Sequence, residues 1–426
     1  MDEWKEYKVA EIIEEISMGP FGSNIKRDNY VDSGIPYLNG SNLSSYKLNE
    51  DSFNYVTEVK AKSLGRCVAK RGDIIVTHRG TIGQISYIPY DSKYEHYLTG
   101  NSQFRLTVNN KIVRPDFFVY YFHTRMGQHR LLANASQVGV PALARPTSTF
   151  KEVLVPVPKM EMQNKIMDIL HSLDDKIEVN RRINDNLEQQ AQALFKSWFV
   201  DFEPFKDNEF VESEMGMIPK GWRVKSLSEI ADYVNGLAMQ KYRLEDGEIG
   251  LPVLKIKELG QGGFDTNSDY CSPSKIGEKY IIKDGDIIFS WSGTLMVKIW
   301  CGGKCGLNQH LFNVVAKNYP KWFAYQWTRH HLDNFIRIAK DKAVTMGHIK
   351  RGELDKAKVL IPESYQMKTI SDIMKPIHLQ MISNEQESRR LATLRDTLLP
   401  KLMSGELKVN EVIRESEEIL GNPRRL

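Results

Sequence analysis

Two polar segments occupy the same place in a repeated pattern but carry different side chains. Thr77-His78-Arg79 follows Gly72-Asp73-Ile74-Ile75-Val76, and Ser290-Trp291-Ser292 follows Gly285-Asp286-Ile287-Ile288-Phe289. Each segment leads into a Gly-Thr pair. Arginine and histidine can donate to guanine edges in the major groove of DNA, and hydroxyl and indole groups suit other bases. We interpret the segments as tips that recognise different bases. The alternative is two turns whose side chains are merely solvated.

Other polar residues near these tips suit the same chemistry. The glycine-rich stretch 19–27 ends in two cations and corresponds to 236–243, where backbone amides and cations suit phosphate contacts. The amides in 101–103 and 308–310 can pair with adenine, and polar-to-basic stretches lie at 137–145 and 345–351. For each candidate the alternative is a solvated surface position. The candidate DNA-binding residues are Lys26, Arg27, His78, Arg79, Thr81, Asn101, Gln103, Arg105, Arg145, Lys241, Arg243, Ser290, Trp291, Ser292, Thr294, Asn308, Gln309, His310, His348, Lys350 and Arg351.

Catalytic signatures are missing from the sequence. It contains no Asn-Pro-Pro-Tyr or Asp-Pro-Pro-Tyr tetrapeptide of an amino-methyltransferase and no phosphate-binding P-loop. Cys271, Cys301 and Cys305 fit no common zinc-ligand spacing with His310, and the matching positions of the first half lack cysteine. We therefore expect no catalytic residue, metal or cofactor in this chain.

The candidate residues belong to an internal duplication. Trp4 with Glu11-Ile12 returns 218 residues later as Trp222 with Glu229-Ile230. Val153-Leu154-Val155-Pro156 returns as Val359-Leu360-Ile361-Pro362, and the offset drifts to about 204 along the chain. Gly34-Ile35-Pro36-Tyr37-Leu38 also returns, as Gly250-Leu251-Pro252-Val253-Leu254. Five such matches in the same order establish a duplicated domain, because chance does not keep them in register.

Each copy predicts a mixed α/β domain followed by a long helix. Short apolar runs between Gly, Asn, Asp and Pro predict strands, and aromatic residues at helical spacing predict a core helix near residues 117–122 and 322–327. After Pro158 and Pro362 apolar residues alternate by three and four, as in a coiled-coil seam. Asn180 and Asn384 share one seam position, where asparagine fixes register. We predict an α+β fold whose two helices pair as an antiparallel coiled coil with pseudo-two-fold symmetry. A single amphipathic helix packed on its own domain is the alternative.

Charge divides along the same boundaries. Residues 1–158 and 219–362 carry net charges of +3 and +7, whereas residues 159–218 carry −6. Two basic domains joined by helices suit an extended polyanion such as duplex DNA, and predict a bipartite target with an unrecognised spacer. The expected parts are a first recognition domain (1–158), a central spacer helix (159–200), a linker (201–218), a second recognition domain (219–362), a C-terminal spacer helix (363–406) and a charged tail (407–426).

Three segments carry a family resemblance. Leu194-Phe195-Lys196-Ser197-Trp198-Phe199, Gly216-Met217-Ile218-Pro219-Lys220-Gly221-Trp222 and Leu398-Leu399-Pro400-Lys401-Leu402-Met403-Ser404-Gly405 closely resemble the spacer regions of specificity subunits from type I restriction–modification systems. The repeat itself covers nearly the entire chain. Two features depart from a regular seam: Pro400 would kink the second helix, and Ser388 and Arg395 would weaken its packing.

The resemblance implies a non-catalytic subunit that binds double-stranded DNA and two methyltransferase subunits, with motor–nuclease subunits added in the full complex. Adenine would be methylated within each half-site from S-adenosylmethionine, which the partner methyltransferase would bind, after the base has left the stack. Exposed residues that flank the seam in 163–199 and 366–403 would form the docking surface.

Composition sets the broad class of protein. The 426 residues include 41% hydrophobic and 26% charged residues and four cysteines, which is ordinary for a globular protein of two or three domains without a disulfide framework. No signal peptide or apolar run of about 18 residues is visible, so we expect a cytoplasmic protein without a membrane span. Two rivals stay open: a self-contained nuclease–methyltransferase, and a coiled-coil scaffold that does not bind DNA.

Overall fold

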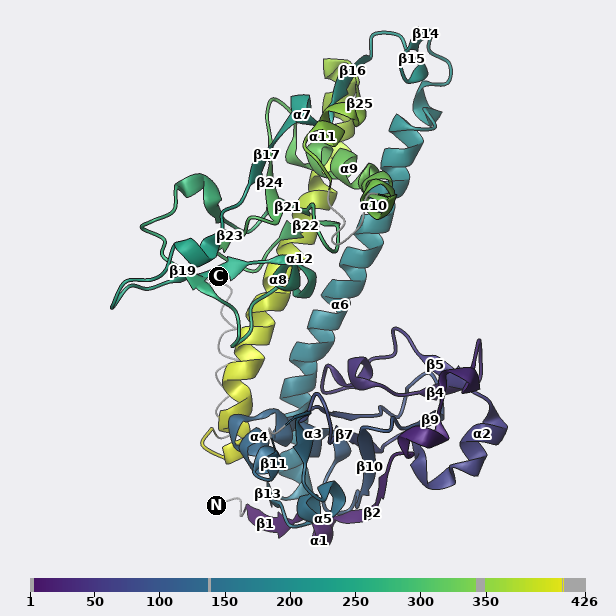
Figure 1. Cartoon of the computed structure of the whole chain (residues 1–426), viewed down its shortest axis with the longest axis vertical. Coiled ribbons are helices and arrows are strands. Elements are labelled where there is room, and N and C mark those ends of the chain that lie inside the picture. The colour runs from purple at the N-terminus through teal and green to yellow at the C-terminus, as the bar shows by residue number, and fades with distance from the viewer. Residues whose placement is uncertain (1–3, 137–138, 342–348, 408, 410–426) are drawn as a thin grey trace. The chain divides into compact units, whose positions relative to one another are not determined.

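The chain forms two compact units. The computed structural model describes residues 4–136, 139–341, 349–407 and 409 of the 426-residue chain. Unit 1 comprises Met1–Asp174 and Thr393–Leu426, and unit 2 comprises Asp175–Ala392. Each unit contains one copy of the repeat together with segments of the two long helices α6 (Met160–Phe199) and α12 (Ser364–Ser404) (Figure 1).

Unit 1 is built on an antiparallel sheet in the order β2-β10-β7-β8. Its strand β7 reads Ile74-Ile75-Val76-Thr77 and is buried throughout, as expected of a short apolar run with both faces covered. Helix α3 begins at Pro115, whose missing N–H costs nothing in the first turn, and it contributes the aromatic side chains of the core. A second sheet follows the order β3-β5-β4-β9-β6, with β4 and β9 parallel, and β1 pairs with β13.

The remaining bounds of unit 1 complete this description. The strands are β1 (Lys5–Lys8), β2 (Ile13–Met18), β3 (Tyr30–Val31), β4 (Ile35–Tyr37), β5 (Asn54–Val56), β6 (Val68–Lys70), β7 (Ile74–Thr77), β8 (Ile85–Tyr87), β9 (His96–Leu98), β10 (Gln103–Val108), β11 (Ala135–Ser136), β12 (Ala142–Leu143) and β13 (Leu154–Val157). The helices are α1 (Val9–Ile12), α2 (Glu58–Ser63), α3 (Pro115–His123), α4 (Arg125–Leu132) and α5 (Pro146–Lys151).

Unit 2 repeats this topology. Its main sheet has the order β17-β24-β21-β22, a second pairing set has the order β19-β18-β23-β20 with β18 and β23 parallel, and β16 pairs with β25. Lys5 faces Val157 in unit 1 and Arg223 faces Ile361 in unit 2, so the paired residues differ by 218 and 204 positions between the copies. The predicted duplication and α+β fold are thereby confirmed, including the drift of the offset.

The bounds of unit 2 add one element that the sequence did not indicate. A hairpin, β14 with β15, starts within the expected linker 201–218 and ends at Pro219. The strands are β14 (Phe210–Ser213), β15 (Gly216–Pro219), β16 (Arg223–Ser226), β17 (Ala231–Asn235), β18 (Leu251–Leu254), β19 (Tyr270–Cys271), β20 (Ile281–Ile282), β21 (Asp286–Ser290), β22 (Met296–Trp300), β23 (Cys305–Leu307), β24 (Leu311–Ala316) and β25 (Lys358–Ile361). The helices are α7 (Leu227–Ile230), α8 (Ile256–Gln261), α9 (Lys321–His330), α10 (Leu332–Asp341) and α11 (Gly352–Lys356).

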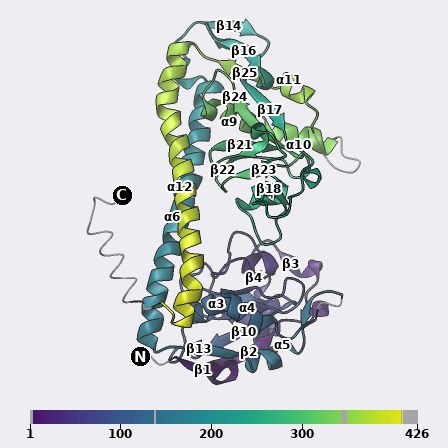
Figure 2. The same cartoon turned by 90° about the vertical axis from the view of Figure 1, so that its left-hand side faces the viewer.

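Within unit 2 the two long helices pair antiparallel through a layer of amides. Asn180 donates through Nδ2 to Glu387 Oε2 at 2.7 Å, and Asn384 donates through Nδ2 to Asn184 Oδ1 at 2.9 Å. Asn184 in turn donates to the carbonyl oxygen of Met381 at 3.0 Å. Partner numbers on α12 fall as those on α6 rise, which confirms the antiparallel pairing (Figure 2). The seam asparagines therefore meet in one buried, hydrogen-bonded cluster.

Within unit 1 the same two helices meet through an ion pair. Arg395 of α12 donates through NH1 to Asp174 Oδ1 of α6 at 2.6 Å, and the hydroxyl of Tyr120 also donates to Asp174. The guanidinium carbon of Arg395 lies 5.1 Å from the ring centroid of Tyr46. The expectation that Arg395 weakens the seam is therefore wrong for this position, because an acidic partner and an aromatic face both receive the cation.

Each hydrophobic core takes side chains from both long helices. The core of unit 1 contains Ile166 and Leu170 of α6 together with Leu399 and Leu402 of α12. The core of unit 2 contains Phe195 and Phe199 of α6 as well as residues of α12. Phe195 packs edge-on against Trp327 of α9 with ring centroids 4.9 Å apart. The apolar stripes that predicted a coiled coil thus also cover the sheets and their helices.

Leu402→Ala tests the contribution of α12 to unit 1. Leu402 is fully buried, so we expect the free energy of unfolding to fall by about 2–5 kcal/mol. Leu394→Ala on the same helix is the control, because Leu394 is 46% exposed and its loss should cost less than about 1 kcal/mol. Urea unfolding measures the two changes. Hydrogen exchange should show the loss of protection in β10 of unit 1, and faster exchange confined to unit 2 would contradict the assignment.

His378 of α12 predicts acid sensitivity of unit 2. It is buried against the Tyr325 ring, and burial lowers its pKa to about 4, with Lys321 nearby adding to the shift. The unfolded imidazole titrates near 6.5, so the unfolded state binds more protons between pH 6.5 and 4 and stability falls as the pH falls through this range. We expect His378→Gln to reduce this loss by about 3 kcal/mol in urea unfolding measured from pH 7 to 4. Identical pH profiles for both proteins would contradict it.

Candidate nucleic-acid interface

The candidate residues of unit 1 gather where three strands end at one edge of the sheet. Strand β10 lies between β2 and β7 and is antiparallel to both. The ends of β2 and β7 and the start of β10 therefore meet, with Met18 beside Phe104 and Thr77 beside Gln103. The loops that follow β2 and β7 and precede β10 contain most of the predicted contacts of unit 1, while Gln103 and Arg105 lie on β10 and Arg145 follows β12.

Backbone hydrogen bonds hold these loops together. The N–H of Gly19 donates to the Gln103 carbonyl at 2.9 Å, and the N–H of His78 donates to the Ser102 carbonyl at 2.9 Å. The N–H of Leu143 donates to the His78 carbonyl at 2.8 Å, which adds the stretch 139–145 to the group. A Cβ on Gly19 would stand 2.1 Å from the carbonyl oxygen of Gly100, so only glycine permits this approach. We call this arrangement the loop cluster of unit 1.

A cavity of about 470 Å³ lies in the loop cluster of unit 1. Arg79 and Asn101 on its wall are exposed, while His78 is half-buried. Burial lowers the pKa of His78, which keeps the imidazole neutral near pH 7. Among the described residues, Nε2 of His78 has no hydrogen-bond partner. The cavity is lined by Met18, Gly19, Pro20, Phe21, Gly22, His78, Arg79, Gly80, Asn101, Ser102 and Val140.

Three other predicted contacts have their polar groups engaged inside unit 1. Gln103 is buried and accepts the Gly100 N–H at 2.8 Å. Arg105 is buried and pairs with Glu15 at 2.7 Å and with Asp73 at 3.5 Å. Thr81 donates its hydroxyl to Gln84 at 2.6 Å. Gln103 therefore supports the cluster through Gly100, whereas the partners of Arg105 lie outside the cluster, and neither side chain lines the cavity.

Unit 2 has the same backbone frame at the matching positions. The N–H of Gly236 donates to the Leu311 carbonyl at 3.0 Å, and the N–H of Trp291 donates to the His310 carbonyl at 3.4 Å. The N–H of Ile349 donates to the Trp291 carbonyl at 3.2 Å, as Leu143 does to His78 in unit 1. The second loop cluster is thus built on the duplicated scaffold.

Side chains distinguish the second cluster from the first. The indole of Trp291, at the position of His78, packs against Phe312 with centroids 5.6 Å apart and donates to Asn235 Oδ1 at 3.1 Å. Ser292, at the position of Arg79, lies with its hydroxyl 3.0 Å from Nδ1 of His310. Ser290 is fully buried and donates to the Thr294 carbonyl at 2.8 Å. A cationic, open surface in unit 1 therefore corresponds to a compact hydroxyl–imidazole surface in unit 2.

Most of the remaining candidates are either amides beside the second loop cluster or exposed cations. Asn308 is buried and accepts the His310 N–H at 3.2 Å, while Gln309 beside it is half-buried. His348 lies outside the described residues. Arg145 has a φ of 45°, a left-handed conformation that is uncommon for arginine. The exposed cations are Lys26, Arg27, Arg145, Lys241, Arg243, Lys350 and Arg351.

Sequence reasoning missed Phe21. Its side chain is 83% exposed and lines the cavity of the first cluster beside Arg79 and Asn101. Phe21 lies between the end of β2 at Met18 and the 3-10 turn Gly22–Asn24, and its backbone is extended. The available signal was an aromatic residue inside a glycine-rich loop rather than at a core spacing.

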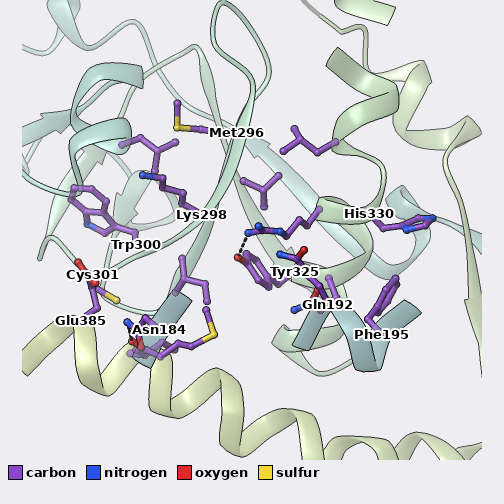
Figure 3. A pocket seen from close by; sticks show the side chains of 18 of the residues that line it. Asn184, Gln192, Phe195, Met296, Lys298, Trp300, Cys301, Tyr325, His330 and Glu385 are labelled. Carbon is purple, nitrogen blue, oxygen red and sulfur yellow. Dashed lines mark hydrogen bonds between the residues drawn. The ribbon is translucent and has the colours of Figure 1, made fainter. Parts of the chain in front are cut away.

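Unit 2 also contains a larger cavity away from its loop cluster. It measures about 750 Å³ and lies between α6, α9, β22 and α12 (Figure 3). Arg329 on its wall donates to the Tyr325 hydroxyl at 3.0 Å, and both contact Glu188 of α6. No described candidate for DNA contact lines this cavity.

The described part of the chain offers no site for a metal ion, no readily ionised thiol at Cys271 or Cys301 and no membrane-spanning helix. No group of three or more His, Cys, Asp or Glu residues there has metal-binding geometry. Burial raises the pKa of the Cys271 thiol to about 11 and that of Cys301 to about 12. None of its helices has an apolar stretch long enough to cross a bilayer.

Two copies of one scaffold with different loop tips define a duplicated recognition protein. The family described as the type I restriction modification DNA specificity domain matches residues 1–189 and 219–392. The chain belongs to this family.

Named relatives extend along almost the whole chain. The type I restriction enzyme MjaIX specificity subunit of Methanocaldococcus jannaschii is 28% identical over 422 residues, covering 96% of this chain and 95% of the relative. The HindI specificity subunit of Haemophilus influenzae is 24% identical over 481 residues, covering 96% and 100%. The crystal structure of a type I restriction–modification S subunit from M. genitalium superposes with a TM-score of 0.50 at 16% identity, covering 94% and 96%, which shows a shared fold.

Proposed function

We propose that this chain is the DNA-recognition subunit of a type I restriction–modification enzyme and recognises a bipartite, asymmetric site in double-stranded DNA. Each loop cluster contacts one half-site. The observation that carries the proposal is the shared backbone frame with different tips, His78-Arg79 in one cluster and Trp291-Ser292 in the other. A common frame gives both clusters the same approach to the major groove, while different tips select different bases.

The proposed contacts separate into two kinds. Arg79, Asn101 and His78 in unit 1, and Ser292, Gln309 and His310 in unit 2, suit base edges because they line or border the clusters. The exposed cations around the clusters suit phosphates, which fix position without selecting sequence. Gln103 and Ser290 hold the clusters in shape through their internal partners, while Arg105 is engaged by Glu15 and Asp73 within the sheet.

Methylation and cleavage take place in partner subunits under this proposal, and the chain itself is non-catalytic. Two methyltransferase subunits that bind S-adenosylmethionine dock on the long helices, and motor–nuclease subunits join them in the full complex in the cytoplasm. Exposed apolar residues within unit 2 support docking there, since Val179 and Ile183 on α6 and Ile373 and Leu379 on α12 are all at least 40% exposed.

The proposal is tested by mapping methylated adenines in host DNA with and without the gene. We expect one bipartite motif to lose methylation when the gene is deleted and to regain it on complementation. An unchanged pattern in cells that express the subunits would contradict the proposal. Duplex binding by the complex with its methyltransferases then separates recognition from a scaffold role, because a scaffold alone would leave the DNA unbound.

Arg79→Ala tests base recognition by unit 1. We expect affinity for the cognate duplex to fall about 10- to 100-fold and selectivity to relax at one base of one half-site, because a guanidinium contact is lost. Lys26→Ala is the matched control: it should weaken binding to cognate and unrelated duplexes alike and reduce the salt dependence by about one phosphate contact. Fluorescence anisotropy of the methyltransferase complex measures both. Equal effects of Arg79→Ala on every sequence would reassign Arg79 to the phosphates.

A further inference from the structure

Phe21 is an apolar group at the edge of a polar cavity. Its ring is 83% exposed, whereas Pro20 before it and Ile25 after it are buried. Gly22 packs so that an added Cβ would lie 3.4 Å from Asn101 Nδ2, and Gly19 is bonded to Gln103. The loop is thus anchored at several points, and the ring is held outward beside Arg79 and Asn101.

The ring is not required to build the loop. Gly19-Pro20-Phe21-Gly22 corresponds to Gly236-Leu237-Ala238-Met239 in unit 2, so alanine occupies the position of Phe21. The loop of unit 2 keeps the same backbone bond, from the Gly236 N–H to the Leu311 carbonyl at 3.0 Å. Because unit 2 builds the same loop with alanine at this position, and unit 1 leaves the phenylalanine ring exposed, the ring of Phe21 is available to contact a ligand.

The surroundings specify the kind of ligand. Val140, 56% exposed, is a second apolar group on the same cavity, and Arg79, Asn101 and Ser102 supply polar groups beside the two. An occupant must therefore offer hydrogen-bonding atoms and a small apolar group on one face. In the major groove an adenine–thymine pair offers both, because the 5-methyl group of thymine stands beside hydrogen-bonding base edges.

We propose that Phe21 contacts the 5-methyl group of a thymine in the half-site that unit 1 recognises. The inference rests on the proposed DNA recognition and adds a base and an atom to it. A wedge inserted between stacked bases, as in minor-groove proteins, would turn the ring away from base edges that Arg79 and Asn101 are placed to meet. The half-site of unit 1 therefore contains thymine, and its recognition depends on Phe21.

The test removes the methyl group and the ring separately. The full complex with methyltransferase subunits is titrated with the cognate duplex and with duplexes in which each thymine in turn is replaced by deoxyuridine. For the wild type we expect one replacement, in one half-site, to weaken binding about 3- to 10-fold. For Phe21→Ala the native duplex should bind as weakly as the wild type binds that replaced duplex, and the replacement should have no further effect.

Two further variants separate the contact from a change in fold. Phe21→Leu should keep part of the sensitivity to the methyl group, because it retains an apolar side chain. Val59→Ala on α2 is the matched control, since Val59 is 79% exposed in the same unit and lies outside the cavity lining. We expect all three variants to unfold at the wild-type temperature and Val59→Ala to bind as the wild type does.

Several outcomes would overturn the inference while leaving DNA recognition intact. They are a half-site without thymine, wild-type binding that no deoxyuridine replacement weakens, and an equal penalty for the replacement in wild type and Phe21→Ala. A wild-type complex that does not bind the cognate duplex at all would instead contradict the proposed function, and this inference with it.

Discussion

Closure of each core by both long helices is the constraint on which the rest of the structure depends. Leu399 and Leu402 come from the second helix but pack in the core of unit 1, and Phe195 and Phe199 come from the first helix but pack in unit 2. Neither copy of the repeat buries its apolar surface alone, so helix pairing and domain folding are one process. The polar groups between the helices differ in kind, an ion pair in unit 1 and amides in unit 2, which gives each stretch its own partner.

Much of this fold could be predicted from the sequence because the sequence contains two copies of the domain and its helix. Matching strand signals indicated a mixed α/β domain in each copy, and the two seams with their shared asparagine position indicated the antiparallel pairing. The sharing of cores was harder to foresee, because a seam leucine and a core leucine obey the same spacing of three and four. Arg395 is a second example. Its position in the seam predicted weaker packing, because the sequence does not show that Asp174 and Tyr46 lie beside it in the folded chain.

The sequence indicated where the site lies along the chain, but not which of its side chains are free to contact DNA. The duplicated pattern located all three loops, since loops at one sheet edge follow from strand order. Residue type did not reveal which polar groups are already occupied: Arg105 is an apparent DNA ligand until Asp73 and Glu15 are seen beside it. Nor did type identify Phe21, because an aromatic residue usually signals a core, and exposure is a property of the folded loop rather than of the residue.

The order of synthesis gives the shared cores a further meaning. Every residue of the unit 2 core lies between Ala191 and Met374, whereas the unit 1 core also needs Leu399, Leu402 and Met403. At about 5–20 residues per second, the ribosome takes roughly 10–45 s to travel from the end of the first copy to those leucines. The domain that is synthesised first therefore completes its core last. Its apolar surface stays exposed until Leu399, Leu402 and Met403 have been made.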